Sequence, residues 1–335
     1  MSNFLYLEED DIASAVTLND AIVALEQGLK WLGEDSAINI PKALATFGDG
    51  ASLHSLGSAF PLQGWAGFKN WVHTKNGATA MYVMFDTRTG ELAALMEAFL
   101  LGQLRTAAIA GVATRWMSDS AADEMALIGT GAQAMAQLAG VAAVRRLRRV
   151  RVFSPTTESR TAFVDAARKR FSFEIQACDT LESAVGDVPI VTLVTRARAP
   201  FLKAEMLAKG THINAMGAIL PANSEFEDTL FDRADVVAVD DLANAKRASR
   251  EFIDHYEHLD QGWADVQLLS DIIASGRVRR KDDDLSIFKA MGMGISDLSM
   301  AIAALERARE LGLGKSSPHP VRAEMVWKEM ESSTP

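Results

Sequence analysis

Residues 124–140 read EMALIGTGAQAMAQLAG, and this stretch decides the fold. The apolar run from Met125 to Ile128 predicts a buried strand, and the small residues after it predict a turn into a helix. In such a turn the first glycine permits a tight bend, the second lets the backbone approach a pyrophosphate, and a third small residue packs the helix on the strand. The unpaired N–H groups at the helix start favour an anion. The residues predicted to hold the phosphates of a dinucleotide are Gly129, Gly131, Ala132, Gln133 and Ala134.

The sequence after this turn alternates between candidate strands and helices, as a parallel α/β sheet requires. An ordinary helix N-terminus would explain the turn alone, so the alternation decides in favour of a dinucleotide-binding domain. The predicted strands are Arg149 to Phe153, Phe173 to Gln176, Ile190 to Val194, His212 to Met216, Val236 to Val239 and Leu285 to Ala290.

The region before the turn has a different pattern. Residues 86–90 carry the turn residues of a hairpin. A long helix at the other end of the chain, Ile295 to Leu311, is closed by Gly312 and can return to this first region. The first domain is then discontinuous. Its predicted elements are helices at Leu18 to Trp31 and Ala98 to Met117, with strands at Ala66 to Asn70, Met81 to Phe85 and Leu92 to Glu97.

The composition excludes several classes of function. The formal net charge of −10 argues against a nucleic-acid or anionic-membrane partner, because either would favour a basic face. The basic run RRLRRVR at residues 145–151 straddles a predicted helix end and the next strand, so we predict a solvated helix end there. The single cysteine, Cys178, rules out an internal disulfide and suits a reducing compartment.

No targeting or spanning segment is visible. The first residues, MSNFLYLEEDD, lack the basic and apolar parts of a secretory signal. No apolar run approaches the roughly 18 residues of a spanning helix. We therefore predict a cytoplasmic protein, and its length of 335 residues favours two domains.

Six segments carry a resemblance to a known family. They are GFKN at 67–70, MFDTRTGEL at 84–92, LRTAA at 104–108, IGTGAQA at 128–134, INAMGA at 213–218 and GISDL at 294–298. In this order and at this spacing, they resemble the ornithine cyclodeaminase/mu-crystallin family over nearly the whole chain. No single segment would be specific.

The resemblance implies an α/β fold. A Rossmann-type dinucleotide-binding domain, residues 121–299, is expected to be inserted into a discontinuous α+β domain, residues 1–120 plus 300–335. The discontinuous domain would bind substrate and form a homodimer. The substrate would carry an α-amino or α-imino carboxylate and lie against nicotinamide in the cleft between the domains.

The resemblance places Lys69 on the family's catalytic lysine and Arg105 on its carboxylate-binding arginine. A guanidinium can hold a carboxylate bidentately, and a half-buried lysine near other cations can donate a proton to an imine nitrogen. Taken alone, a surface ion pair for Arg105 and a solvated strand end for Lys69 are simpler interpretations. The family match favours the catalytic ones.

Three departures limit this comparison. Lys42 follows Pro41 where many relatives have an arginine, so a second carboxylate anchor would be a point charge rather than a fork. Ile219 replaces an aspartate that ornithine cyclodeaminases use for the side-chain amine, which predicts a substrate whose distal part is apolar, short or differently charged. His54 falls where relatives place a Met-Pro or similar strand, and we expect a structural histidine rather than a ligand.

The cofactor choice depends on the end of the second nucleotide-domain strand. An acid there would bind the ribose hydroxyls of NAD, but this chain has Ser154. Ser154, Thr156 and Arg160 could hydrogen-bond a 2′-phosphate, so NADP(H) is favoured and NAD(H) remains possible. The resemblance places Thr195, Met216 and Gly217 on the nicotinamide side.

The predicted function is an NAD(P)H-dependent reductase of an α-imino acid, either a cyclic ketimine or the imine of a 2-oxo acid. The alternatives are a cyclodeaminase that releases ammonia with tightly held NAD, and a mu-crystallin-like binding protein. No metal is expected: His255 and His258 have a compatible spacing, but no third cluster supports them.

Overall fold

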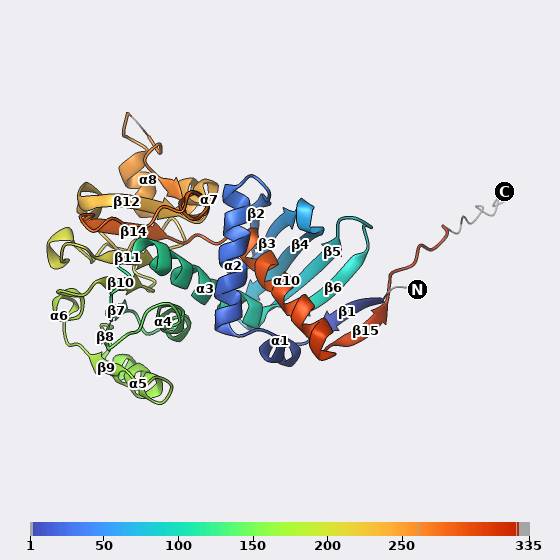
Figure 1. Cartoon of the computed structure of the whole chain (residues 1–335), viewed down its shortest axis with the longest axis horizontal. Coiled ribbons are helices and arrows are strands. Elements are labelled where there is room, and N and C mark those ends of the chain that lie inside the picture. Colours follow the sequence, from blue (N-terminus) through green and yellow to red (C-terminus); the bar gives the residue numbers. More distant parts are fainter. Residues whose placement is uncertain (1–2, 261, 326, 328–335) are drawn as a thin grey trace, which may run out of the picture.

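The computed structural model describes residues 3–260, 262–325 and 327, and their strands form two sheets that lie in separate parts of the molecule (Figure 1). A mostly antiparallel sheet contains the N-terminal strands and the last strand, and a parallel sheet contains the strands between them. The predicted α/β fold, with a Rossmann-type parallel sheet beside an α+β part, is confirmed.

The mostly antiparallel sheet joins both ends of the chain. Its order is β15-β1-β6-β5-β4-β3-β2, and β1 pairs antiparallel with β15 but parallel with β6. The remaining neighbours are consecutive antiparallel strands. The strands are β1 (Asn3–Leu7), β2 (Ile38–Phe47), β3 (Ala51–Phe60), β4 (Trp65–Thr74), β5 (Gly77–Asp86), β6 (Leu92–Glu97) and β15 (Lys315–Pro318).

The second sheet is parallel throughout and has the order β13-β12-β14-β11-β10-β7-β8-β9. The order of the strands reverses between β7 and β10, because β8 and β9 lie on one side of β7 and the later strands lie on the other. Open α/β sheets bind nucleotides at such a switch point. The strands are β7 (Glu124–Ile128), β8 (Arg149–Phe153), β9 (Glu174–Ala177), β10 (Ile190–Leu193), β11 (His212–Ala215), β12 (Ala234–Val239), β13 (Gln267–Leu268) and β14 (Leu285–Lys289).

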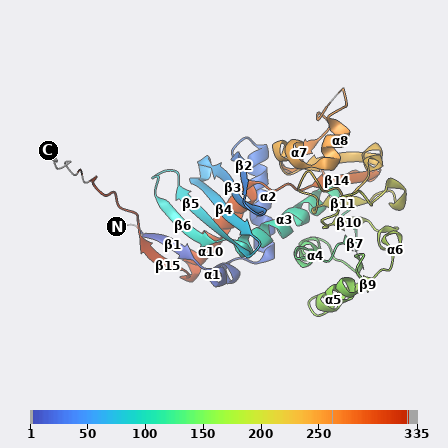
Figure 2. The same ribbon diagram turned by 180° about the vertical axis from the view of Figure 1, so that it is seen from behind.

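Three long helices connect the two sheets. Helix α10 lies on one face of the antiparallel sheet, α2 packs against α10, and α3 runs from the first sheet towards β11 and β14 of the second (Figures 1 and 2). Leu25, Ile109, Leu298 and Phe288 belong to one buried cluster that spans the junction. The helices are α1 (Glu9–Ala15), α2 (Leu18–Gly33), α3 (Phe99–Met117), α4 (Ala134–Ala142), α5 (Thr157–Arg168), α6 (Leu181–Val185), α7 (Leu242–Ala248), α8 (Arg250–Tyr256), α9 (Leu269–Ser275) and α10 (Gly294–Leu311).

The predicted helices and strands are present, with ends that move by a few residues. The hairpin of β2 and β3 is missing from the predictions, because Pro41 and three glycines interrupt its pattern. The register of β2 shifts between Ile40 and Ala43, and this bulge accommodates the proline. Helix α10 packs on the first sheet from its start at Gly294, so the expected domain boundary at 299/300 falls inside a continuous helix.

Helix α3 is held at both ends. Glu9 accepts hydrogen bonds from the backbone N–H groups of Phe99 and Leu100, at 2.7 and 2.8 Å. At the other end, the buried Arg145 guanidinium donates to the carbonyl of Thr114 at 2.7 Å. The prediction of a solvated helix end is therefore wrong for Arg145, whose guanidinium also donates to the carbonyls of Arg115 and Ser118, both at 3.2 Å.

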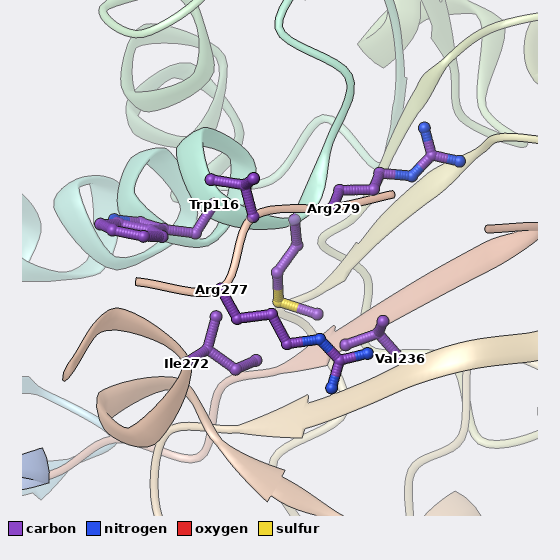
Figure 3. Close-up of a pocket in the computed structure, with 7 residues that line it drawn as sticks. Trp116, Val236, Ile272, Arg277 and Arg279 are labelled. Atoms are coloured by element: carbon purple, nitrogen blue, oxygen red, sulfur yellow. The ribbon is translucent and has the colours of Figure 1, made fainter. Parts of the chain in front are cut away.

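A cavity of about 10 Å³ lies between the end of α3, β12 and the segment after α9. Figure 3 shows Trp116, Val236, Ile272, Arg277 and Arg279 around it. One water molecule needs roughly 10–15 Å³, so this space is too small for a metabolite. Across the described ranges, no helix combines the length and apolar character needed to cross a membrane.

Candidate active site

Lys69 and Asp297 form a buried ion pair between the antiparallel sheet and α10. Lys69 of β4 is 5% exposed, and its Nζ donates to Oδ1 of Asp297 at 2.8 Å. The carboxylate lies in the first turn of α10, where the helix dipole favours a negative charge. The helix start comes close to the sheet because Gly294 lies on Gly57: a Cβ at Gly294 would be 2.2 Å from the carbonyl oxygen of Gly57.

The surroundings change the protonation of Lys69. Burial lowers the pKa of Lys69, the charge of Asp297 raises it, and the charge of Arg105 lowers it again. A lysine in such a site can release a proton more readily than a solvated one. The sequence singled out Lys69 but assigned no role to Asp297, although the segment 294–298 that contains it was among those that carry the resemblance.

Arg105 lies in α3, beside the same carboxylate. Its Nε is 3.8 Å from Oδ1 of Asp297, too far for a hydrogen bond, and has no hydrogen-bond partner in the part of the chain that is described. The end of the guanidinium lies near Gly292, where an added Cβ would be 3.3 Å from the first terminal nitrogen. No carboxylate among the described residues pairs bidentately with Arg105. Its fork can therefore bind a carboxylate from outside.

Lys42 is brought to the same site by the bulge of β2. Its Nζ lies 5.7 Å from the centroid of the Trp71 ring, and Nζ of Lys69 lies 5.1 Å from it. His54 stacks on Trp71 with centroids 4.4 Å apart and bonds to the hydroxyl of Ser52. Burial lowers the pKa of His54 to about 4, so this histidine is neutral and supports the indole.

Asp240 is a second buried acid without an assigned role in the sequence analysis. It follows β12 and accepts hydrogen bonds from the backbone N–H groups of Met291 and Gly292, both at 2.7 Å. Burial raises the pKa of Asp240 to about 6, while these two N–H groups and the charge of Arg105 oppose the rise. Asp240 thus fixes the turn after β14, and Arg105 lies against Gly292 of this turn. Because the turn follows the carboxyl end of β14, Arg105 and the nearby Lys42 and Lys69 lie at the carboxyl edge of the parallel sheet.

The turn after β7 fits a pyrophosphate. Gly129 has a φ of 110°, which favours glycine, and a Cβ at Gly131 would meet no heavy atom within 4 Å. Ala134 is fully buried at the start of α4, and no side chain caps this helix. Ala132 and Gln133 complete the turn. The open space and the uncapped N–H groups together make a cradle for an anion.

A valine at position 131 tests this cradle. We expect Gly131→Val to raise the Kd of NAD(P)H at least about tenfold, because the side chain would occupy space that is open in the protein alone. The measurement is a cofactor titration followed by protein fluorescence. The thermal unfolding temperature without cofactor is the control and should stay near that of the unsubstituted protein. Undiminished affinity in the folded variant would contradict the assignment.

The three residues predicted to bind a 2′-phosphate after β8 differ in exposure and in their contacts. Ser154 is buried, whereas Thr156 is exposed and precedes α5. The side chain of Arg160 packs against the protein rather than pointing into solvent. Its guanidinium donates to the carbonyl of Ser154 at 2.8 Å and to the carboxylate of Asp179 at 3.0 Å. Arg160 therefore holds the strand end in place, and a direct bond to a 2′-phosphate would have to replace one of these contacts.

Thr195, Met216 and Gly217 lie together after β10 and β11. The N–H group of Met216 donates to the carbonyl of Leu193 at 2.8 Å. Thr195 and Gly217 both bond to the carboxylate of Glu225, a residue that the sequence analysis did not single out. Its only sequence signal is an acid placed between apolar and small residues in a loop.

Comparisons with known proteins identify relatives of this chain. The model of the ornithine cyclodeaminase/mu-crystallin family matches residues 10–312. The chain is 29% identical over 242 residues to a Delta(1)-pyrroline-2-carboxylate reductase of Bacillus cereus, which covers 72% of this chain and 74% of the relative. It is 28% identical over 321 residues to an alanine dehydrogenase of Archaeoglobus fulgidus, covering 92% and 97%.

A solved structure shows the same fold over nearly the whole length. It is an archaeal alanine dehydrogenase dimer with bound NAD, with a TM-score of 0.86, 25% identity, and coverage of 94% of this chain and 98% of the other. The match of the family model across most of the chain shows that this protein belongs to the ornithine cyclodeaminase/mu-crystallin family.

Proposed function

We propose that the protein is an NAD(P)H-dependent oxidoreductase that reduces the C=N bond of an α-imino acid, with amino-acid dehydrogenation as the reverse reaction. The observation that carries the proposal is the cluster of Lys69, Arg105 and Lys42 at the carboxyl edge of the parallel sheet, the edge at which open α/β sheets bind nucleotides. The pyrroline-2-carboxylate reductase and the alanine dehydrogenase named above support the same class of reaction.

The three cations share two roles in this reaction. The fork of Arg105, helped by the charge of Lys42, holds the carboxylate and orients the α-carbon. A reduced nicotinamide, when bound, supplies the hydride to this carbon. The nitrogen of a neutral imine then needs one proton, which Lys69 can donate from Nζ. Asp297 keeps Lys69 in place during this step.

The distal part of the substrate is proposed to be something other than an ammonium group. Ile219 is 42% exposed in the loop after β11 and offers no carboxylate. Trp71, with Lys42 close to its ring, forms a wall that is aromatic and positively charged. These residues favour an apolar, short or acidic distal group over the side chain of ornithine.

A homodimer is proposed from the exposed face of the antiparallel sheet. The face opposite α10 exposes apolar side chains that a monomer would leave in water, and the solved alanine dehydrogenase is a dimer. These side chains are Ile38, Leu53, Phe68, Val72 and Phe85. In this proposal the antiparallel sheet and α10 form the substrate and dimerisation domain, and the parallel sheet forms the dinucleotide domain.

The decisive experiment is an assay of NADPH and NADH oxidation. The panel consists of cyclic imino acids and of 2-oxo acids with and without ammonia or methylamine. We expect oxidation that depends on the imine and no production of proline and ammonia from ornithine. Stoichiometric proline and ammonia from ornithine without added reductant would identify a cyclodeaminase instead. Tight cofactor binding with no imine-dependent oxidation would identify a binding protein.

We propose NADP(H) as the preferred cofactor, because no acid at the end of β8 repels a 2′-phosphate. Ser154→Asp should then shift the ratio of kcat/KM values towards NADH by about tenfold or more, since a carboxylate binds ribose hydroxyls and repels the phosphate. Ser154→Ala is the matched control, because it removes the hydroxyl without adding charge. A preference of the unsubstituted enzyme for NADH by more than about tenfold would contradict this choice.

Lys42 should make activity sensitive to alkaline pH. Burial, together with the charges of Arg105, Arg247 and Lys69, lowers the pKa of Lys42 to about 8. Because the charged form binds the carboxylate, kcat/KM should fall as the pH rises through about 8. In Lys42→Arg this step should disappear, since arginine stays charged. The measurement is a kcat/KM profile of both enzymes, and an identical alkaline step in the two would contradict the role of Lys42.

A further inference from the structure

The carboxylate of Glu225 ties together two loops at the cofactor edge of the parallel sheet. Its Oε1 accepts hydrogen bonds from the backbone N–H and the hydroxyl of Thr195, at 2.6 and 2.8 Å. Its Oε2 accepts from the N–H groups of Gly217 and Ala218, at 3.0 and 3.1 Å. Glu225 is fully buried, so these four donors replace the water that the charge loses.

The two loops follow the neighbouring strands β10 and β11. Thr195 also lies against the phosphate turn, because a Cβ at Gly129 would be 3.1 Å from its methyl carbon. The approach is closer still at Gly217, where a Cβ would be 2.3 Å from both Oε1 of Glu225 and the backbone nitrogen of Thr195. Glu225 therefore sets the spacing between the ends of β10 and β11.

Glu225 is itself held from behind by α8 and β14. Its backbone N–H donates to Oε1 of Glu251 at 2.9 Å. Oε2 of Glu251 lies 3.6 Å from Nζ of the fully buried Lys289. The Glu225 carboxylate is buried, and both its side chain and its backbone are hydrogen-bonded. Moving it would cost free energy because these bonds would be lost, so the two loops have one preferred separation.

We propose that Glu225 is the positioning residue for the nicotinamide half of the dinucleotide. It acts through the backbone N–H groups of Thr195, Gly217 and Ala218 and through the hydroxyl of Thr195, and it makes no hydrogen bond to the turn at 129–134. This inference rests on the proposed dinucleotide cofactor. It assigns the phosphates and the nicotinamide ring to two different parts of the site. The turn at 129–134 holds the phosphates, and the pair of loops joined by Glu225 holds the reacting ring.

Glu225→Gln separates these roles. The amide keeps one acceptor oxygen but turns an NH₂ group towards one of the two pairs of donors, so one loop loses its partner. We expect the Kd of the preferred reduced dinucleotide to rise by about tenfold. The Kd of the matching fragment without nicotinamide, ADP-ribose or its 2′-phosphate, should change by less than about twofold. Both are measured by calorimetric titration of the full chain.

Two controls accompany this variant. Glu227→Gln changes a nearby acid that pairs with Lys203 at 3.9 Å, at the far ends of the two loops from Thr195 and Gly217, and should alter neither affinity. If Glu225→Gln does not fold, Thr195→Val removes only the hydroxyl donor, and Thr195→Ser retains it. The valine variant should lose dinucleotide affinity selectively, and the serine variant should keep it.

The outcomes are distinct. A selective loss for the dinucleotide supports the proposal. Equal losses for the dinucleotide and the fragment would show a general structural role and overturn it, as would unchanged affinity for both. If the unsubstituted protein bound neither compound, the proposed cofactor itself would be wrong, which is a separate result from a failure of the Glu225 variants.

Discussion

Arg105→Ala is expected to lower kcat/KM for the α-imino acid about a thousandfold, or ~4 kcal/mol. The loss should appear in both KM and kcat, because the guanidinium binds the carboxylate and also orients the reacting carbon. The structure supports this magnitude: Arg105 makes no hydrogen bond through Nε among the described residues, and its side chain is only 20% exposed. A substrate carboxylate would therefore supply the hydrogen-bond acceptor that the Arg105 guanidinium lacks in the described structure.

Further variants separate the effect of bidentate binding by Arg105 from the effect of its positive charge. Arg105→Lys keeps the charge but cannot bind bidentately, so it should recover only part of the loss. Arg88→Ala removes an exposed arginine that pairs with Asp86 and should leave kcat/KM unchanged. A kcat/KM within about tenfold of the unsubstituted value in Arg105→Ala would show that another group binds the carboxylate.

The strand–turn–helix unit at residues 124–142 was predictable from sequence because its signal is local. The bend at Gly129, the open space at Gly131 and the small Ala134 all lie within one strand–turn–helix unit. The parallel sheet follows from the same kind of signal, since each strand and helix shows its own periodicity. Lys69 and Arg105 were found through the family resemblance, and neither composition nor spacing would have separated them from surface charges.

The rest depends on contacts between distant residues. Asp297 becomes a partner of Lys69 only because α10 returns to the first sheet, 228 residues away in the chain. The four bonds of Glu225 require the ends of β10 and β11 to be adjacent, which no single segment reveals. Arg160 was expected at a 2′-phosphate but bonds to Ser154 and Asp179, because its position on α5 points the side chain back onto the strand end.

Lys69→Ala should lower kcat by about a thousandfold, within the range of 10²–10⁴ for the loss of a general acid, and should change KM little. The reason for this contrast with Arg105 is that Lys69 is already paired with Asp297 at 2.8 Å, so its contribution comes when the nitrogen accepts a proton. Lys69→Arg keeps a charge but is a far weaker acid, and its kcat should remain low.

The control for Lys69→Ala is Lys75→Ala, which removes an exposed lysine just beyond the end of the same strand and should leave kcat unchanged. A neutral Lys69 variant also leaves the buried Asp297 without its hydrogen-bonded cation, so the double variant Lys69→Ala with Asp297→Asn tests whether that carboxylate causes the loss. If the double variant regains most of the activity, Lys69 only neutralises Asp297. If kcat stays low in both, while the affinity for the dinucleotide is kept, Lys69 is the proton donor of the reaction.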